Sequence, residues 1–295
     1  MPSFTALARE LSALCGVRCE AAPAQRLGGA GGSESYQWPC EKGTLFVKVG
    51  PGERRPALEA EAAGLGELSR AQALRVPRVL ASGATDDAAF LALEWIDAAP
   101  ADSACARRLG EGLAALHAVT APRFGWGRDN TIGRTSQTNG WMEEWAGFFR
   151  ERRLRPQLDL AVENGFGRLV ETPGERLLES VHRLLAGHAP RASLLHGDLW
   201  GGNWLATAEG EPVLIDPAVY YGDREADLAM TRLFGGFGGA FYRAYEAADP
   251  LPPGAGLRRD LYNLYHVLNH ANLFGGRYAR QARDMIDRLL AEVRS

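Results

Sequence analysis

The hydrophobic pattern of the chain changes near residue 97. Before that point, short apolar runs alternate with turn residues, a pattern typical of strands. Helical spacing appears only in residues 3–15 and in the Ala/Glu/Leu-rich segment Ala57–Leu68. The predicted strands are 36–40 and 44–49, joined by a turn at Lys42-Gly43, and then 76–82 and 89–96. We therefore expect a small sheet with one helix packed on it.

Beyond the break at Asp97–Pro100 the periodicity becomes helical, apart from one strand-rich segment, Leu194–Asp216. The predicted helices are Ala104–His117, Gly140–Arg153, Gly174–Leu185, Asp223–Phe234 and the segment from Leu257 to the end. This order of elements predicts an α+β protein with two lobes. Residues 1–96 would form the β-rich lobe and residues 97–295 the α-rich lobe.

Composition narrows the class of protein but does not identify it. Hydrophobic residues make up 46% and charged residues 23% of 295 residues, as in soluble globular proteins. The net charge of −3 gives no reason to expect a nucleic-acid partner. No signal peptide or membrane span is expected, and Cys15, Cys19, Cys40 and Cys105 fit no metal or disulfide spacing. These features predict a cytoplasmic protein without a membrane partner.

The strand-rich segment carries the residues with the clearest chemistry. Asp198 and Asn203 are five residues apart in a glycine-containing loop, and Asp216 follows thirteen residues later, after a strand. Phosphoryl transfer needs a carboxylate to accept the proton of the attacking hydroxyl and oxygen ligands to hold Mg²⁺. The three residues supply both kinds of group.

This spacing resembles the catalytic loop of protein kinases and aminoglycoside phosphotransferases, and His196-Gly197-Asp198 resembles the second group. The resemblance implies a protein-kinase-like fold, with Asp198 as the base and Asn203 and Asp216 as Mg²⁺ ligands. It also implies that Lys48, on a strand, binds the phosphates of ATP. Glu61 is its expected ion-pair partner, with Glu59 as a rival.

The same resemblance implies further ATP contacts in the first lobe. The Glu94 carbonyl and the Ile96 amide would bind the adenine edge at a hinge. Backbone amides of the glycine-rich segment 28–33 would cover the phosphates, although the segment departs from G-x-G-x-x-G. The residues expected there are Gly29, Gly31, Gly32 and Ser33.

Only residues 217–226 separate Asp216 from Asp227. A protein-kinase activation segment with its peptide-docking part would not fit in this interval, so protein kinase activity is not expected. Asp227 resembles the buried acid that supports the catalytic loop in this fold, and His196 is expected to share that role.

Longer strings resemble the fructosamine kinase (ketosamine-3-kinase) family over about residues 25–280. They are HGDLWGGNW at 196–204, DPAVYYGDREADLAM at 216–230, LFGGF at 233–237, FGWGRDNTIG at 124–133, NGW at 139–141, LYHVLNH at 264–270 and LFG at 273–275. The resemblance implies ATP-dependent phosphorylation of the sugar 3-hydroxyl of ketosamines, which are the adducts of glucose or ribose with amines. Loss of the phosphorylated sugar would then free the amine and repair the protein.

Tryptophans are concentrated near the predicted catalytic loop, and sugar faces stack on aromatic rings. Trp200, two residues from Asp198, is the expected sugar platform, whereas Trp145 and Trp204 are expected in the core. Asp223 and Glu225 are candidates for contact with the cationic amine of the substrate. His266 and His270 lack a third metal ligand and are expected to line or support the substrate side.

Two alternatives remain open from the sequence. Another small-molecule kinase, of the aminoglycoside, choline, homoserine or methylthioribose type, shares the His-Gly-Asp, Asn and Asp core. A non-catalytic nucleotide-binding module is the other, although Lys48, Asp198, Asn203 and Asp216 are all present. The expected partner is a small-molecule or glycated-lysine ketosamine, bound by a monomer or homodimer.

Overall fold

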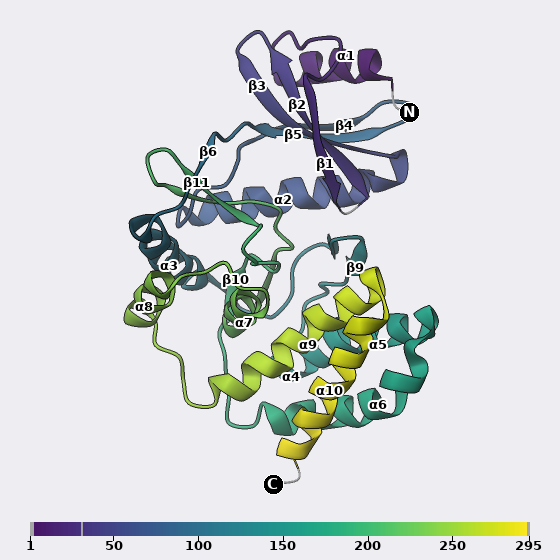
Figure 1. Cartoon of the computed structure of the whole chain (residues 1–295), viewed down its shortest axis with the longest axis vertical. Helices are drawn as coiled ribbons and strands as arrows, with labels where there is room; N and C mark the ends of the chain where they lie inside the picture. Colours follow the sequence, from purple (N-terminus) through teal and green to yellow (C-terminus); the bar gives the residue numbers. More distant parts are fainter. Residues whose placement is uncertain (1–2, 31, 294–295) are drawn as a thin grey trace.

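A five-stranded antiparallel sheet forms one end of the molecule in the computed structural model, which describes residues 3–30 and 32–293 (Figure 1). The strand order is β1-β2-β3-β5-β4. The strands are β1 (Gln25–Ala30), β2 (Ser33–Cys40), β3 (Gly43–Gly50), β4 (Val79–Ala84) and β5 (Ala89–Glu94). β1 was not predicted, because its glycines resemble a loop in sequence, yet its backbone pairs with β2.

Helices α1 (Phe4–Cys15) and α2 (Arg55–Ala71) pack on this sheet, so the lobe carries two helices rather than the single one expected. Strand β5 is buried on both faces and separates two cores. Phe90 and Ala92 pack in the core that contains α1, whereas Leu91 and Leu93 pack in the core that contains α2. Successive side chains of a strand point to opposite faces, which explains this division.

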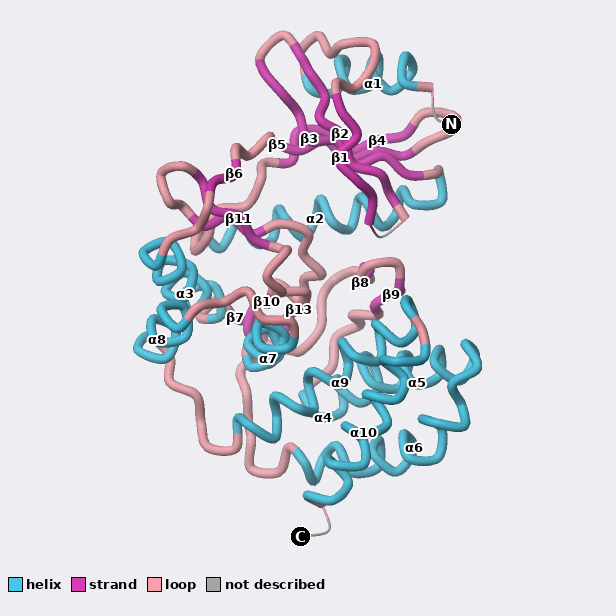
Figure 2. Tube along the Cα trace, in the orientation of Figure 1, coloured by secondary structure: helices cyan, strands magenta, loops and turns pink. Residues whose placement is uncertain are grey.

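Helices fill the other end of the molecule (Figure 2). They are α3 (Ser103–His117), α4 (Trp145–Phe148), α5 (Arg155–Ala161), α6 (Gly167–Leu184), α7 (Glu225–Leu233), α8 (Gly239–Ala248), α9 (Ala255–Phe274) and α10 (Gly276–Glu292), with π-helical turns η2 (Phe149–Leu154) and η3 (Val162–Phe166). A 3₁₀ turn, η1 (Gly52–Arg54), precedes α2 in the first lobe. The α+β, two-lobed architecture predicted from the sequence is therefore confirmed.

Small strands connect the helical part to the sheet. β6 (Ala98–Ala99) pairs with β11 (Trp204–Thr207), so the segment that follows the large sheet joins the second lobe immediately. The remaining short strands are β7 (Thr120–Ala121), β8 (Asn130–Ile132), β9 (Thr135–Gln137), β10 (Ala192–Leu195), β12 (Pro212–Leu214) and β13 (Tyr220–Gly222). The division at residues 96 and 97 stays a prediction.

Three predicted helices differ from the structure in extent. The helix expected from Gly174 begins earlier, at Gly167, and contains Pro173. The helix expected from Gly140 begins only at Trp145, because the Met142 backbone forms two hydrogen bonds with Phe124. The helix expected from Leu257 to the end is divided at Gly275, whose φ of 100° and ψ of −165° are not helical. None of the described helices is long and apolar enough to cross a membrane.

Candidate active site

Lys48 points toward α2 because successive side chains of β3 point to opposite faces of the sheet. Val47 and Val49 lie in the core beneath α1, so Lys48 between them faces the opposite side. Its Nζ lies 2.8 Å from Glu61 Oε1 on α2 and 2.8 Å from Asp216 Oδ1 in the second lobe. The rival acid Glu59 instead pairs with Arg55 on the surface of the helix.

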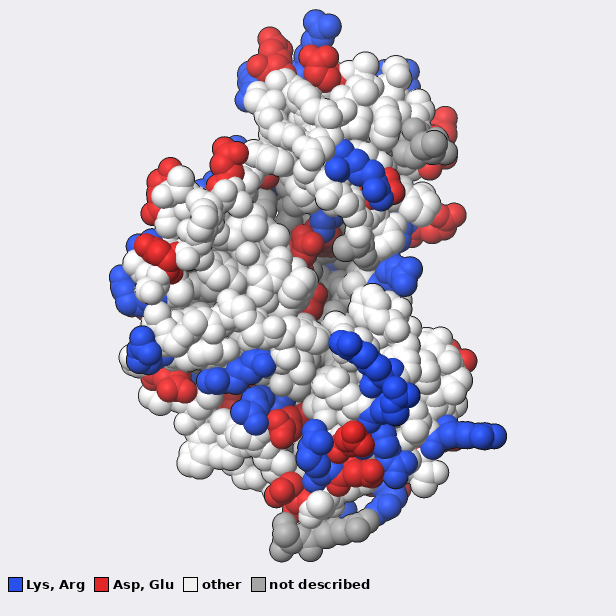
Figure 3. Space-filling view, viewed as in Figure 1, with Lys and Arg blue, Asp and Glu red and all other residues white. Residues whose placement is uncertain are grey.

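The three groups join the two lobes electrostatically. Burial alone would lower the pKa of Lys48, but the carboxylates of Glu61 and Asp216 raise it above its ordinary value. Lys48 is therefore charged at neutral pH. Acidic and basic atoms also face each other in the hollow between the lobes (Figure 3).

The loop after β10 requires glycine at position 197. Gly197 has a φ of 84°, and a Cβ on it would collide with the Ala218 carbonyl oxygen. This close approach explains the glycine between His196 and Asp198. His196 is buried, and its Nε2 lies 2.8 Å from the Ile215 carbonyl oxygen, which ties the loop to the segment that carries Asp216.

Asp227, at the start of α7, accepts hydrogen bonds from the loop backbone. The His196 amide lies 2.7 Å from its Oδ2 and the Gly197 amide 2.9 Å from its Oδ1. Burial would raise the pKa of this carboxyl, but His117, His196 and the Gly197 amide hold it below its usual range. The contacts have the geometry expected for support of the loop by Asp227 and His196.

Asp198 and Asn203 lie against each other. Asn203 Nδ2 donates to the Asp198 carbonyl oxygen at 2.9 Å and to its carboxylate at 3.2 Å. Burial, followed by the negative charge of Asp216, raises the pKa of Asp198 to about 7. A carboxylate with such a pKa is suited to accept a proton near neutral pH.

The donor set fits a magnesium ion. Asp216 keeps 39% of its side chain exposed, and its Oδ2 is not the oxygen that contacts Lys48. Asn203 uses its amide nitrogen for Asp198. Its Oδ1 accepts no hydrogen bond from the part of the chain that the structure describes. Carboxylate and amide oxygens are the ligands that Mg²⁺ takes in proteins.

The predicted hinge lies where β5 ends. The Glu94 side chain pairs with Arg75 at 2.8 Å. The contact of the Glu94 carbonyl with adenine stays a prediction. Ile96 lies between β5 and β6, and its amide donates to no group within residues 3–30 and 32–293. The amide is therefore available for a ligand.

The glycine-rich segment was expected to be a separate loop before the first hairpin. In the structure it is part of the β1–β2 hairpin. Gly29 pairs with Glu34 within it, and Ser33 opens β2. Gly32 lies in the turn with a φ of 84°. Gly31, predicted with them to bind ATP, lies outside the described residues.

Trp200 is 41% exposed and lies next to the catalytic loop, as a sugar platform requires. Its ring covers Gly202, where any Cβ would collide with it. Trp145 is buried and donates to the Tyr262 hydroxyl at 2.9 Å, and Trp204 packs on Phe237. Trp145 is a core residue, as expected, whereas Trp204 is only partly buried and packs against the core.

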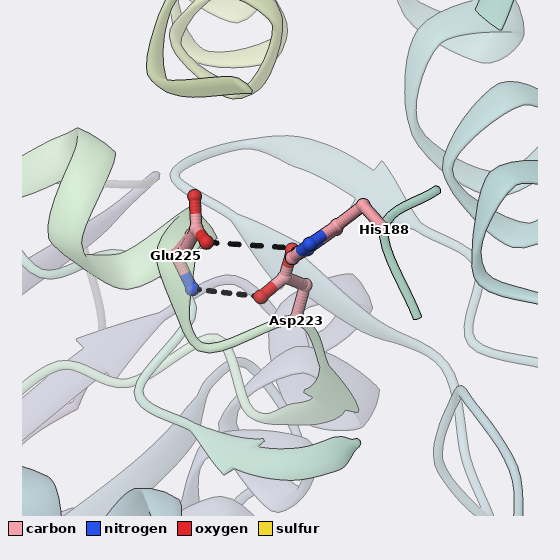
Figure 4. Close-up of side chains that lie close together, drawn as sticks. All are labelled: His188, Asp223 and Glu225. Atoms are coloured by element: carbon pink, nitrogen blue, oxygen red, sulfur yellow. Dashed lines mark hydrogen bonds and ion pairs between the residues drawn. The ribbon is translucent and has the colours of Figure 1, made fainter. Parts of the chain in front are cut away.

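The placement of Asp223 and Glu225 does not fit the predicted contact with the substrate amine. They are 1% and 3% exposed and belong to a network with His188 (Figure 4). Asp223 Oδ2 lies 2.6 Å from both His188 Nε2 and the Tyr262 hydroxyl, and Arg258 contacts both oxygens of Glu225 at 2.8 and 2.9 Å.

The atoms of His188, Asp223 and Glu225 lie within 4.8 Å of one another, close enough for a metal ion. Each carboxylate oxygen nevertheless has a partner already, because Asp223 Oδ1 accepts from the Glu225 amide at 3.0 Å. The cluster therefore joins the start of α7 to α9 by ion pairs and is not a metal site.

Comparison with known proteins shows the family to which the chain belongs. The sequence pattern of the fructosamine kinase family matches residues 3–292. A protein named as a probable ketoamine kinase from Synechocystis sp. is 45% identical over 247 residues, which are 83% of this chain and 82% of that protein. The chain belongs to the fructosamine kinase family.

Relatives and solved structures agree with this membership. A probable ketoamine kinase of Escherichia coli K12 is 41% identical over 84% of this chain and 85% of its own. A crystal structure from Haemophilus somnus, provisionally named a fructosamine-3-kinase, has a TM-score of 0.89 at 28% identity and covers 98% of both chains. An aminoglycoside phosphotransferase, APH(4)-Ia, has a TM-score of 0.60 at 16% identity over 97% of this chain and 98% of its own, and shows the shared fold.

Sequence reasoning missed two residues that support the loop carrying Asp198 in this member of the family. His117 Nε2 lies 3.2 Å from Asp227 Oδ2, and its Nδ1 lies 2.7 Å from the Tyr245 hydroxyl. His117 ends α3 and Tyr245 lies on α8, so no local pattern connects them to Asp227. Only their complete burial next to a carboxylate reveals the role.

His266 and His270 lie on one side of α9. Burial lowers the pKa of His266 to about 3, and this neutral ring is packed against Tyr265. His270 contacts the His266 carbonyl oxygen at 2.8 Å and packs its ring against Phe234 and Phe274. The two rings therefore have different contacts, and a role for either on the substrate side stays a prediction.

Proposed function

We propose that the protein is an ATP-dependent ketosamine kinase that phosphorylates the 3-hydroxyl of fructosamine or ribulosamine adducts. The observation that carries this proposal is the contact of Lys48 with Glu61 and Asp216, next to Asp198 and Asn203, in a chain of the fructosamine kinase family. These residues supply a base, metal ligands and a phosphate-binding cation.

In this mechanism Asp198 orients the sugar hydroxyl and accepts its proton as the oxygen bonds to the γ-phosphorus of ATP and ADP leaves. Asn203 fixes the Asp198 carboxylate by the hydrogen bond of 3.2 Å. Lys48, held by Glu61, contacts the phosphates. Asn203 and Asp216 would hold Mg²⁺, which neutralises phosphate charge when bound.

Trp200 would stack on the sugar of the acceptor. Its exposed ring lies in the same loop as Asp198, in which His196, Leu199 and Asn203 are buried. Asp223 and Glu225 are not retained as ligands of the substrate amine, because their oxygens are engaged with other residues. Removal of sugars from glycated amines in the cytoplasm, by a monomer or homodimer, stays a prediction.

A substrate panel with Mg-ATP tests the function. We expect phosphorylation of fructosyl-lysine and ribulosyl-lysine analogues and of a glycated protein, with little or none of aminoglycosides, choline, homoserine or methylthioribose. Trp200→Ala should raise KM for the ketosamine about 5- to 150-fold, and KM for ATP much less, because one side of the sugar loses its stacking surface. Turnover of an aminoglycoside without turnover of any ketosamine would overturn the proposal.

A further inference from the structure

Two arginines from opposite lobes lie at the tip of the β1–β2 hairpin. Arg54 precedes α2, and Arg134 lies in the turn between β8 and β9. A Cβ added at Gly32 would lie 3.6 Å from Arg54 Cδ and 3.7 Å from Arg134 Cδ. Both side chains therefore reach the same glycine of the hairpin.

Neither arginine has a carboxylate of its own among the described residues. Within residues 3–30 and 32–293, Arg54 and Arg134 form no ion pair, whereas Arg26, Arg55 and Arg258, for example, each have a carboxylate partner. Glu61 interacts electrostatically with Arg54 but is already paired with Lys48. Burial lowers the pKa of Arg54, the negative charge of Glu61 opposes this, and the positive charge of Arg134 lowers the pKa further. Two like charges held together without a counter-ion are unfavourable unless an anion joins them.

Polar atoms without partners occur at the same place. Ser33 is 7% exposed, and its buried Oγ has no hydrogen-bond partner among the described residues. The same holds for Arg54 Nε. A Cβ added at Gly50 would be 2.9 Å from Ser33 Oγ and 3.1 Å from Arg54 Cβ, and one added at Gly32 would be 3.6 Å from Arg54 Nε. Buried polar atoms without partners in a native protein call for a ligand or water.

The position identifies the anion. Gly50 lies two residues after Lys48 on β3, and Lys48 also contacts the second lobe through Asp216. The start of α2 adds the partial positive charge of a helix N-terminus. An extended polyanion that reaches from the hairpin to Lys48 would satisfy all of these groups, and a nucleoside triphosphate is such a polyanion.

We propose that Arg54 and Arg134, one from each lobe, bind the polyphosphate of the nucleotide together with Ser33 and thereby hold the lobes together around it. This inference rests on the proposed ATP-dependent activity and assigns two residues to it that sequence motifs did not indicate. Arg134 is exposed, so its guanidinium is accessible to the phosphates of a bound nucleotide.

Calorimetric titration of ATP, ADP and AMP with Mg²⁺ and without any acceptor tests the inference. Arg54→Met and Arg134→Met should each weaken ATP binding about 10- to 100-fold, because a hydrogen bond between charged groups is lost. AMP binding should change less than threefold. Arg55→Met is the matched control, since Arg55 is the adjacent residue and pairs with Glu59 on the surface.

Tripolyphosphate is a second probe. It should compete with ATP in the wild-type protein but not in the Arg54→Met/Arg134→Met variant. Arg134→Lys should recover part of the loss, and Arg134 is exposed, so its replacement does not disturb the core. A loss of ATP affinity below threefold in Arg134→Met, or an equal loss for AMP, would overturn the proposal.

The two proposals fail separately. If the arginine variants lose ATP affinity but no ketosamine is phosphorylated, the arginine assignment stands and the proposed substrate class is wrong. If ketosamines are phosphorylated and ATP affinity is unchanged in both variants, the arginine assignment is wrong.

Discussion

At the scale of single residues, Asp198 shows how surroundings determine chemistry. Its carboxylate is partly buried, and this burial and the charge of Asp216 raise its pKa to about 7, while Asn203 fixes its orientation. An aspartate exposed to solvent would keep an ordinary pKa and a mobile side chain. The base of the proposed reaction thus depends on neighbours that the motif itself brings close.

We expect Asp198→Asn to lower phosphorylation about 10²- to 10⁴-fold, since the amide cannot accept the proton of the hydroxyl. Affinity for Mg-ATP should stay within a few-fold of wild type by calorimetry. Asp216→Ala is the contrasting variant and should weaken Mg-ATP binding as well. Phosphorylation by Asp198→Asn within tenfold of wild type would rule out this residue as the base.

At the scale of elements, β3 and α2 act as one unit. The parity of β3 places Lys48 opposite Glu61 of α2, and the pair is largely enclosed, with side chains 12% and 17% exposed. An enclosed ion pair depends strongly on both partners, because either charge alone would be buried without compensation.

A double-mutant cycle measures this dependence. Lys48→Ala and Glu61→Ala should each lower kcat/KM, and the double variant should lose less than the sum of the two in free energy, by about 0.5–3 kcal/mol. The matched control is Glu59→Ala, which removes an exposed acid two residues away on α2. If the two losses add fully, Lys48 and Glu61 do not act together.

At the scale of the whole molecule, Asp227 connects three parts of the second lobe. Its carboxylate accepts hydrogen bonds from the backbone amides of His196 and Gly197 and lies 3.2 Å from His117 at the end of α3. Asp227 itself belongs to α7. A charged group with this many partners contributes to stability as well as to the shape of the loop.

We expect Asp227→Asn to lower the free energy of unfolding by about 1.5–3 kcal/mol at pH 7, because charge-assisted hydrogen bonds are lost. The pKa of Asp227 is lower in the folded protein than in the unfolded chain. Its contribution is therefore complete above the unfolded value of about 3.9 and is lost as the pH falls through the folded value.

Denaturant unfolding of wild type and variant at a series of pH values checks this sign. The difference between them should be largest near neutral pH and shrink in acid. Asp284→Asn, at an exposed position of α10, is the control and should have little effect at any pH. A difference that grows toward acidic pH would contradict the assignment.

The sequence by itself determined the two-lobed α+β fold, the family and the set of chemical groups. Short-range patterns were enough here, since strand parity, helical spacing and the fixed interval between Asp198 and Asn203 are all local. Only the tertiary structure decided which acid pairs with Lys48 and that Asp223 and Glu225 are engaged with His188 and Arg258. It also decided that Gly28–Ala30 form a strand and that Arg54 and Arg134 meet. These outcomes depend on residues far apart in the chain, whose burial and distances arise only when the elements pack.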